Sequence, residues 1–179
     1  NKKMRGGVDS DSPRTKSIKK IQSTARGRMV RQTKKADDFS KVLSSGAAAY
    51  KKKILTMDLK GINLSEAVLS RRVLNGGDLQ KVNFYKTKLN STQLIEANLS
   101  GSKFFYAELK KADLSKAICD KCTFQRTNLM QANFTNAVMK NCEFRSCIAM
   151  STNFTNANLS GSSFSLLSFG GNDTAGYTN

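Results

Sequence analysis

Every fifth residue from Leu59 to Phe169 is apolar. Leu or Phe occupies 20 of these 23 positions, and Cys119, Met139 and Ala149 occupy the other three. The faces of a helix recur about every 3.6 residues and those of a strand every 2, so a period of five requires the chain to change direction in every repeat. A strict repeat of this kind is typical of a solenoid, in which each repeat packs against its neighbours.

We call the Leu or Phe position the central position. Two residues before it, the side chain is Ala, Gly, Ser, Thr, Cys or Val in 19 of the 23 repeats. A spacing of two places both side chains on one face of an extended segment, so both should point into the core. The residue immediately before the central position is Asp or Asn in ten repeats, which predicts an outward polar position with turn chemistry.

This pattern resembles that of the pentapeptide-repeat family, A(D/N)LXX. The match is close at residues 97–101 (ANLSG), 112–116 (ADLSK) and 157–161 (ANLSG). The resemblance covers about two thirds of the chain and implies an all-β solenoid, a right-handed quadrilateral β-helix with four repeats per coil. We therefore expect about six coils over residues 54–169.

Coils of 20 residues would stack residues 20 apart at about 4.8 Å. The central positions then form columns along the solenoid. One column contains Leu64, Phe84, Phe104, Phe124, Phe144 and Phe164. Each end of such a stack exposes apolar side chains and unpaired backbone, so we expect both ends to be covered.

Residues 36–53 are predicted to form a capping helix at the N-terminal end. Apolar side chains recur there at spacings of three and four, at Phe39, Val42, Leu43, Ala47, Tyr50 and Ile54. A helix that binds a partner is the alternative. Residues 170–179 are predicted to be a flexible tail, and no C-terminal cap is visible, so a partner, a second copy or further residues could cover that end.

Residues 1–35 form a basic arm. The first 57 residues contain 16 basic and 4 acidic residues, a net charge of +12 out of +17 for the whole chain. With few large apolar side chains, the arm is expected to be extended and disordered when free. The residues expected to contact a partner are Arg14, Lys16, Lys19, Lys20, Arg26, Arg28, Arg31, Lys34 and Lys35.

Three partners suit a basic arm: an acidic protein assembly, which we favour, RNA held through its phosphates, and an anionic membrane surface. A solvated arm without a partner is a fourth possibility. No run of about 18 apolar residues occurs, so we expect a soluble or peripheral protein without a transmembrane segment. The acid-poor start, which contains Ser and Arg, resembles an organelle transit peptide or the residues that follow one. Many pentapeptide-repeat proteins occur in cyanobacteria and chloroplasts, often in the thylakoid lumen, so the family resemblance implies a chloroplast or thylakoid location.

The four cysteines include a CxxC motif at Cys119 and Cys122, which would suit a zinc site. The repeat places Cys122, Cys142 and Cys147 at the small inward position and Cys119 at a central position. We therefore expect buried thiols, with a Cys122–Cys142 disulfide as the alternative and a metal site least favoured. The chain has no His, and we expect no catalytic residue, cofactor or metal.

Function should then depend on the surface. Tyr85, Phe105 and Tyr106 are predicted to lie close together on the outer wall, and Met130 with Met150 and Ile118 with Val138 form further outward pairs. Outward basic residues are a second candidate, with a solvated face as the alternative. They are Arg71, Lys81, Lys86, Lys110, Lys111, Lys116, Lys121 and Arg126.

Some pentapeptide-repeat proteins resemble duplex DNA in shape and negative charge and bind DNA gyrase. This chain is net positive even within its repeats, so we expect no gyrase mimicry. We predict a non-catalytic scaffold or linker subunit whose β-helix wall and basic arm bind a large acidic assembly, with a photosynthetic assembly as one candidate. The alternatives are a ribosome-associated RNA-binding protein and a peripheral adaptor at a membrane surface.

Overall fold

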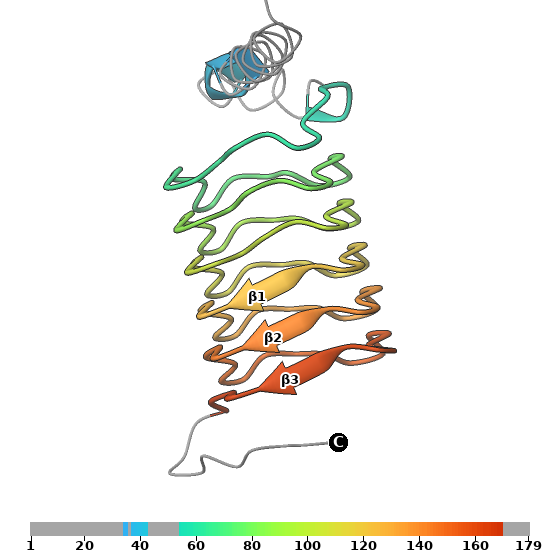
Figure 1. Ribbon diagram of the computed structural model, residues 1–179. Coiled ribbons are helices and arrows are strands. Elements are labelled where there is room, and N and C mark those ends of the chain that lie inside the picture. Colours follow the sequence, from blue (N-terminus) through green and yellow to red (C-terminus); the bar gives the residue numbers. More distant parts are fainter. Residues whose placement is uncertain (1–33, 36, 43–53, 170–179) are drawn as a thin grey trace, which may run out of the picture.

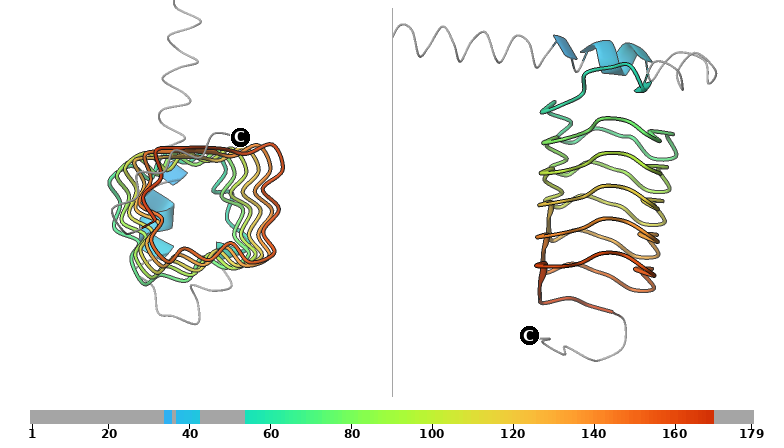
Figure 2. Two further views of the ribbon diagram at one scale, coloured as in Figure 1. Left: turned by 90° about the horizontal axis from the view of Figure 1, so that it is seen from below. Right: turned by 90° about the vertical axis from the view of Figure 1, so that its right-hand side faces the viewer.

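The structure, a computed structural model, describes residues 34–35, 37–42 and 54–169. Residues 54–169 form a stack of coils whose outline is roughly square when seen along the stack (Figure 2). One side of the square carries three short parallel strands (Figure 1): β1 (Thr123–Gln125), β2 (Glu143–Arg145) and β3 (Ser163–Ser165). The predicted all-β solenoid is confirmed.

Paired residues lie 20 apart throughout the stack. Phe124 is opposite Phe144 in the β1–β2 pair, and isolated parallel bridges continue the register from Asn63–Asn83 to Ile148–Ser168. Backbone hydrogen bonds follow the same spacing, because the N–H of a central residue donates to a carbonyl of the next coil. Leu74 N–H, for example, donates to the Gln93 carbonyl at 2.7 Å. The predicted coil of 20 residues is therefore confirmed.

Each corner of the square is a tight turn. The N–H of the small inward residue donates to the central carbonyl three residues earlier, as from Ala97 to Leu94 at 3.1 Å. The second of the two residues in between, here Glu96 (φ 59°), adopts a positive φ, the conformation that a type II turn requires at its third residue. Lysine occupies several of these corners, including Lys81 (φ 57°) and Lys86 (φ 53°), although glycine would fit with less strain. The corner side chains are exposed to solvent, so the turns place a column of side chains along each edge.

The outward Asp and Asn residues hold the turns from outside, as the sequence predicts. Asn83 Oδ1 accepts the N–H of Tyr85 at 3.2 Å, and Asn98 Oδ1 accepts the N–H of Ser100 in the same way. Asn83 Nδ2 also donates to Asn63 Oδ1 one coil away, at 3.2 Å. These side chains satisfy backbone N–H groups that would otherwise depend on water.

The core is a set of stacked columns. The rings of Phe84, Phe104, Phe124, Phe144 and Phe164 lie nearly parallel, with successive centroids 4.7–4.8 Å apart. Phe134 and Phe154 stack in a second column, and each meets a ring of the first column edge to face. Both arrangements are favourable for aromatic pairs.

Small polar side chains fill the remaining interior and donate to central carbonyls of the preceding coil. Ser102 Oγ donates to the Leu79 carbonyl at 2.7 Å, and Thr92 Oγ1 donates to the Leu69 carbonyl at 2.8 Å. In the described part of the chain, every buried side-chain nitrogen and oxygen has a hydrogen-bond partner. The buried hydroxyl groups of this column are thus paired within the solenoid itself.

The two ends of the stack differ. Residues 34–35 and 37–42 are helical and lie across the N-terminal end (Figure 2), where Phe39 and Val42 are buried in the core cluster. Most of the predicted capping helix, residues 36–53, lies outside the described residues, so its role as a cap stays a prediction. At the other end Phe154 and Phe164 are only partly buried, and Phe169 is 48% exposed. No described element covers the C-terminal coil.

Candidate functional site

Tyr85, Phe105 and Tyr106 lie on the face that carries β1–β3, as the repeat register predicts. Tyr85 and Tyr106 come from successive coils, and their rings meet edge to face with centroids 5.9 Å apart. Tyr106 is 43% exposed, whereas Tyr85 and Phe105 are half-buried. Among the described ring pairs, none joins Phe105 to either tyrosine. The structure therefore joins two of the three predicted aromatic residues into one cluster.

Two cations complete this cluster, and we call the group of Tyr85, Lys86, Tyr106 and Arg126 the tyrosine–cation corner. Lys86 Nζ lies 5.2 Å from the centroid of the Tyr85 ring, and Arg126 Cζ lies 5.5 Å from that of Tyr106. One guanidinium N–H of Arg126 donates to the Tyr106 hydroxyl at 2.5 Å. Cation–π contacts of exposed residues contribute about 0.5–1 kcal/mol each, enough to bias the side chains toward these positions.

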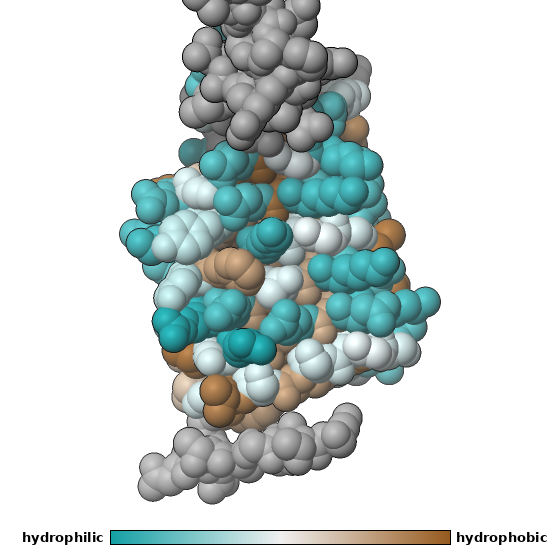
Figure 3. Space-filling view, in the orientation of Figure 1, coloured by the Kyte–Doolittle hydropathy of each residue, from teal (hydrophilic) through white to brown (hydrophobic). Residues whose placement is uncertain are grey.

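The face around the corner is basic. Lys81 and Lys121 occupy corner positions at its other edge, two coils apart, and Lys103 lies between these edges on the intervening coil. Figure 3, drawn in the orientation that shows β1–β3, has mainly hydrophilic surface with more apolar surface near the C-terminal end. The acidic residues on or beside this part of the face are Glu66, Asp120 and Glu143. Glu143 lies on β2 and forms an ion pair with Arg145 at 3.5 Å, and Asp120 Oδ1 accepts the N–H of Lys140 at 3.1 Å. The middle of this face presents a net positive surface.

Most of the predicted contact residues of the arm lie outside the described residues, namely Arg14, Lys16, Lys19, Lys20, Arg26, Arg28 and Arg31. Lys34 and Lys35 are described and helical. Lys35 Nζ forms an ion pair with Asp58 at 2.5 Å and also donates to the Lys60 carbonyl. This hydrogen bond lowers the pKa of Asp58, because it favours the charged carboxylate. In this structure Lys35 thus attaches the helical segment to the first coil.

The cysteines occupy the inward positions that the sequence predicts, and all four are buried free thiols. Cys122, Cys142 and Cys147 take the place of Ser and Thr in the interior, and Cys119 takes that of a central Leu or Phe. Cys122 Sγ donates to the Leu99 carbonyl at 3.0 Å and Cys142 Sγ to the Cys119 carbonyl at 2.9 Å, the same contact that Ser102 makes. The described residues hold no group of three or more potential metal ligands. The CxxC motif is accordingly part of the packing.

Burial changes the acidity of these thiols. It raises the pKa of Cys142 to about 12 and is the main cause of the raised pKa of Cys147. A raised pKa means that folding favours the neutral thiol, so stability is lost as the pH rises through the window from the ordinary pKa of 9.0 to about 12. The unfolded chain ionises first in that window.

We expect the wild-type protein to lose stability above pH 9 more steeply than the Cys142→Ser variant. Serine keeps the donor to the Cys119 carbonyl but does not ionise, so the difference isolates the thiol. The difference between the two slopes of unfolding free energy against pH should not exceed about 1.4 kcal/mol per pH unit, the limit for the release of one proton. Urea denaturation at a series of pH values measures it. Parallel curves for the two proteins from pH 9 to pH 11 would contradict the assignment.

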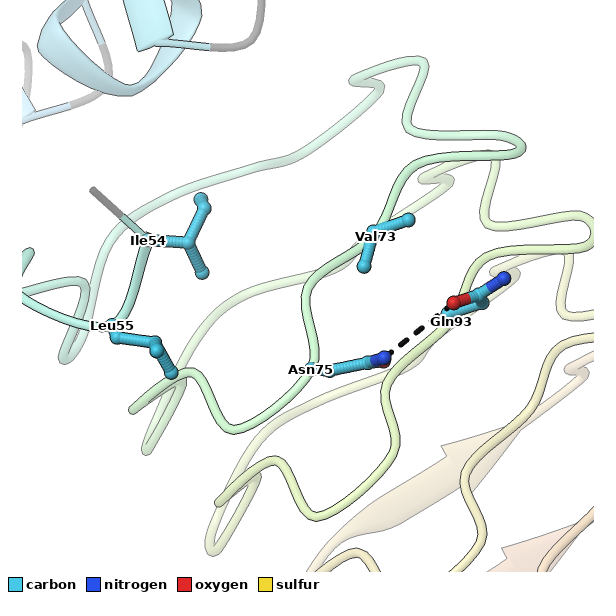
Figure 4. A pocket seen from close by; sticks show the side chains of 5 residues that line it. All are labelled: Ile54, Leu55, Val73, Asn75 and Gln93. Carbon is cyan, nitrogen blue, oxygen red and sulfur yellow. Dashed lines mark hydrogen bonds between the residues drawn. The ribbon is translucent and has the colours of Figure 1, made fainter. Parts of the chain in front are cut away.

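A hollow of about 220 Å³ lies near the first coil, lined by Ile54, Leu55, Val73, Asn75 and Gln93 (Figure 4). Asn75 Nδ2 donates to Gln93 Oε1 at 3.4 Å across its polar side. None of the five lining residues has a titratable side chain, so this hollow offers no general acid or base.

The other outward apolar pairs are separate from the corner. Ile118 is 40% exposed and Met150 is 37% exposed, whereas Val138 and Met130 are half-buried. They lie on other sides of the square and do not merge with the tyrosine–cation corner. Among the described residues, no helix has the length and apolarity needed to cross a membrane.

Comparison with known proteins now places the chain. The sequence pattern of the family described as pentapeptide repeats matches in 8 copies, over residues 62–101, 83–118, 92–131, 107–145 and 127–165. These matches span more than half of the chain, and the protein belongs to the pentapeptide-repeat family. Its members form right-handed quadrilateral β-helices and are generally non-catalytic. No curated protein sequence matches the chain.

Solved structures of the same kind resemble the chain. A pentapeptide repeat protein from Nostoc Pcc 7120 is 25% identical, with 45% of this chain and 67% of that chain covered and a TM-score of 0.45. One from the Arabidopsis thaliana thylakoid lumen is 26% identical, with 61% and 66% covered and a TM-score of 0.33. One from the cyanobacterium Cyanothece 51142 is 21% identical, with 69% and 100% covered and a TM-score of 0.35. The family assignment depends on the repeats and not on these superpositions.

Proposed function

We propose that the protein is a non-catalytic scaffold or linker subunit that binds a large acidic protein assembly through the basic face of its β-helix and its N-terminal arm. The observation that supports this most directly is the tyrosine–cation corner, where Lys86 and Arg126 are held against aromatic rings on the outside of a filled solenoid. Oriented, exposed cations suit binding to an acidic surface.

The rest of the molecule agrees with a spacer or linker. We propose a β-helix of about six coils with a helical N-terminal cap, in which the hydrogen bonds between coils make the wall stiff. The interior holds no unsatisfied polar group among the described residues, and the hollow beside Asn75 and Gln93 has no titratable lining. Binding would therefore use the outer wall. More specifically, we propose that the protein is located in the chloroplast and that its partner is a photosynthetic assembly.

A pull-down with the tagged full-length protein tests the proposal. We expect it to recover acidic proteins from an extract of the cells that express it, and to lose them as salt rises from low ionic strength to about 0.5 M, because exposed charge pairs are screened over a few ångströms there. Removal of residues 1–33 should weaken recovery without abolishing it, since the basic face of the β-helix remains.

The leading alternative is RNA binding by the arm, which its net charge favours. In the same experiment, RNA recovered at low salt and lost when residues 1–33 are removed would overturn the protein-linker proposal. Binding to anionic lipid vesicles without any protein partner would instead support an adaptor at a membrane surface.

A further inference from the structure

We propose that the tyrosine–cation corner is a carboxylate-binding site that receives the side chains of an Asp- or Glu-rich segment of the partner, with Lys86 and Arg126 as the two binding cations. This inference rests on the proposed function and assigns the contact to four residues. It also separates this surface from the arm, most of which lies outside the described residues.

The two cations are oriented before any partner binds. Lys86, Tyr106 and Arg126 occupy the same corner position in three successive coils, so their Cα atoms form a column. Tyr106 lies between the two cations and accepts a hydrogen bond from Arg126. Tyr85 supports Lys86 from the adjacent position. Orientation in the free protein reduces the entropy lost when these side chains bind a partner.

Donors remain available at the corner. Arg126 uses one N–H on Tyr106, and its guanidinium carries four more. The Tyr106 hydroxyl accepts that bond and can still donate its own proton. Within the described part of the chain, neither Lys86 nor Arg126 pairs with a carboxylate, although Glu66 lies one coil away from Lys86 in the same column. The corner thus presents several donors, and no carboxylate of the described residues pairs with its two cations.

The aromatic rings are poorly placed for stacking nucleic-acid bases. Stacking of a base needs an open ring face. Lys86 occupies one face of Tyr85, Arg126 occupies one face of Tyr106, and the two rings meet edge to face at 78°, so the cations compete with a base for these rings. Their role here is to hold cations. This geometry favours an anionic polypeptide over single-stranded RNA at the corner.

The spacing suits an extended acidic segment. Residues two coils apart are separated by about 10 Å along the stack, and carboxylates on alternate residues of an extended chain are about 7 Å apart. The long, flexible side chains of Lys86 and Arg126 can bend toward each other, which makes up the difference of about 3 Å between these two spacings. One carboxylate would meet Arg126 and the Tyr106 hydroxyl, and the next carboxylate on the same side would meet Lys86.

Carbodiimide coupling tests the site in the full-length protein with a poly-Glu peptide as the probe. The reagent activates a peptide carboxylate, the lysine amine displaces the activating group as a urea, and an amide bond records the contact. Mass spectrometry should find at least about five times more coupling at Lys86 than at Lys110, an exposed lysine on the neighbouring side. Equal yields at the two lysines would overturn the proposal.

Variants distinguish binding at a specific site from attraction by the net positive charge of the protein. Arg126→Gln should lower coupling at Lys86 about threefold, and Tyr106→Phe, which removes only the hydroxyl, about twofold. Lys111→Gln is the control: it removes the same charge from the neighbouring side and should change the coupling at Lys86 little. If Arg126→Gln and Lys111→Gln have equal effects, only net charge matters and the site does not exist. Thermal melts of each variant establish that it is folded.

An oligouridylate probe tests the competing mode. Binding that survives Tyr106→Phe but is lost in Tyr106→Ala would show ring stacking and would overturn the carboxylate assignment. Failure of the proposed function looks different, because it would leave no acidic protein in the pull-down while coupling of the peptide at Lys86 persisted.

Discussion

Replacing Phe124 by Ala is expected to lower the free energy of unfolding by about 3–5 kcal/mol. The Phe124 side chain is fully buried, and its ring stacks on Phe104 and Phe144 and meets Phe134 edge to face. Truncation removes all these contacts and leaves a cavity in the middle of the column. The coils on either side are each hydrogen-bonded to the coil of Phe124 through the backbone, so they cannot close the gap without breaking the register.

Phe164→Ala is the matched control for this prediction. Phe164 lies in the same column but in the last described coil, where it is partly buried and stacks on Phe144 alone among the described rings. Its loss should cost less than half as much as that of Phe124. Urea denaturation followed by circular dichroism measures both variants. Equal losses of stability would show that the two ends of the column are equivalent, contrary to the structure.

A carboxylate placed inside the solenoid should have an effect at least as large. Ala117 is fully buried at the small inward position, between Ala97 and Ala137 of the adjacent coils. Ala117→Asp would introduce a larger group and a charge without a cation to pair with it. Buried, unpaired charges cost several kcal/mol, so we expect the variant to be largely unfolded or recovered only as aggregate.

The neighbouring substitution Ile118→Asp provides the control. Ile118 is 40% exposed on the outer wall, so the new carboxylate would remain in water. We expect this variant to fold, with a loss of stability below about 1 kcal/mol. Solubility and thermal melts of the pair test the register directly. If adjacent residues 117 and 118 respond alike, the alternation of inward and outward side chains is wrong at this coil.

The sequence predicts most of the fold, because the five-residue repeat determines which side chains of each coil point inward and which point outward. The spacing of five identifies Phe124 and Ala117 as inward and Tyr85 and Tyr106 as outward, and the spacing of 20 places Phe124 between Phe104 and Phe144. The structure confirms each of these positions. Packing of this kind depends on side-chain size and apolarity, which a sequence displays directly.

The candidate site could be predicted only in part. Because Lys86, Tyr106 and Arg126 are 20 residues apart, the repeat places them in one column, and this much is readable from the sequence. The repeat does not determine which of these flexible side chains contact each other. The hydrogen bond of Arg126 to Tyr106 and the bond of Lys35 to Asp58 depend on rotamers of long, exposed side chains. Several rotamers of such residues have similar energies, so a repeat pattern does not select one.

The cysteines show how the register changes an interpretation. A CxxC motif taken alone suggests a metal site, but the repeat assigns Cys122 and Cys142 to the column of Ser102, one and two coils after it. The structure adds the reason for that equivalence, since all three side chains donate to a central carbonyl. A thiol is thus a slightly larger substitute for a hydroxyl in this column.

The central claim is that this pentapeptide-repeat protein acts by binding an acidic protein through its surface. The most direct measurement is a pull-down with the full-length protein after nuclease treatment, with recovered proteins identified by mass spectrometry for wild type and for the Lys86→Gln/Arg126→Gln variant. We predict an acidic protein that survives the nuclease and falls about tenfold in the variant, while Lys110→Gln/Lys111→Gln retains it. Loss of all bound material after nuclease treatment would contradict the account.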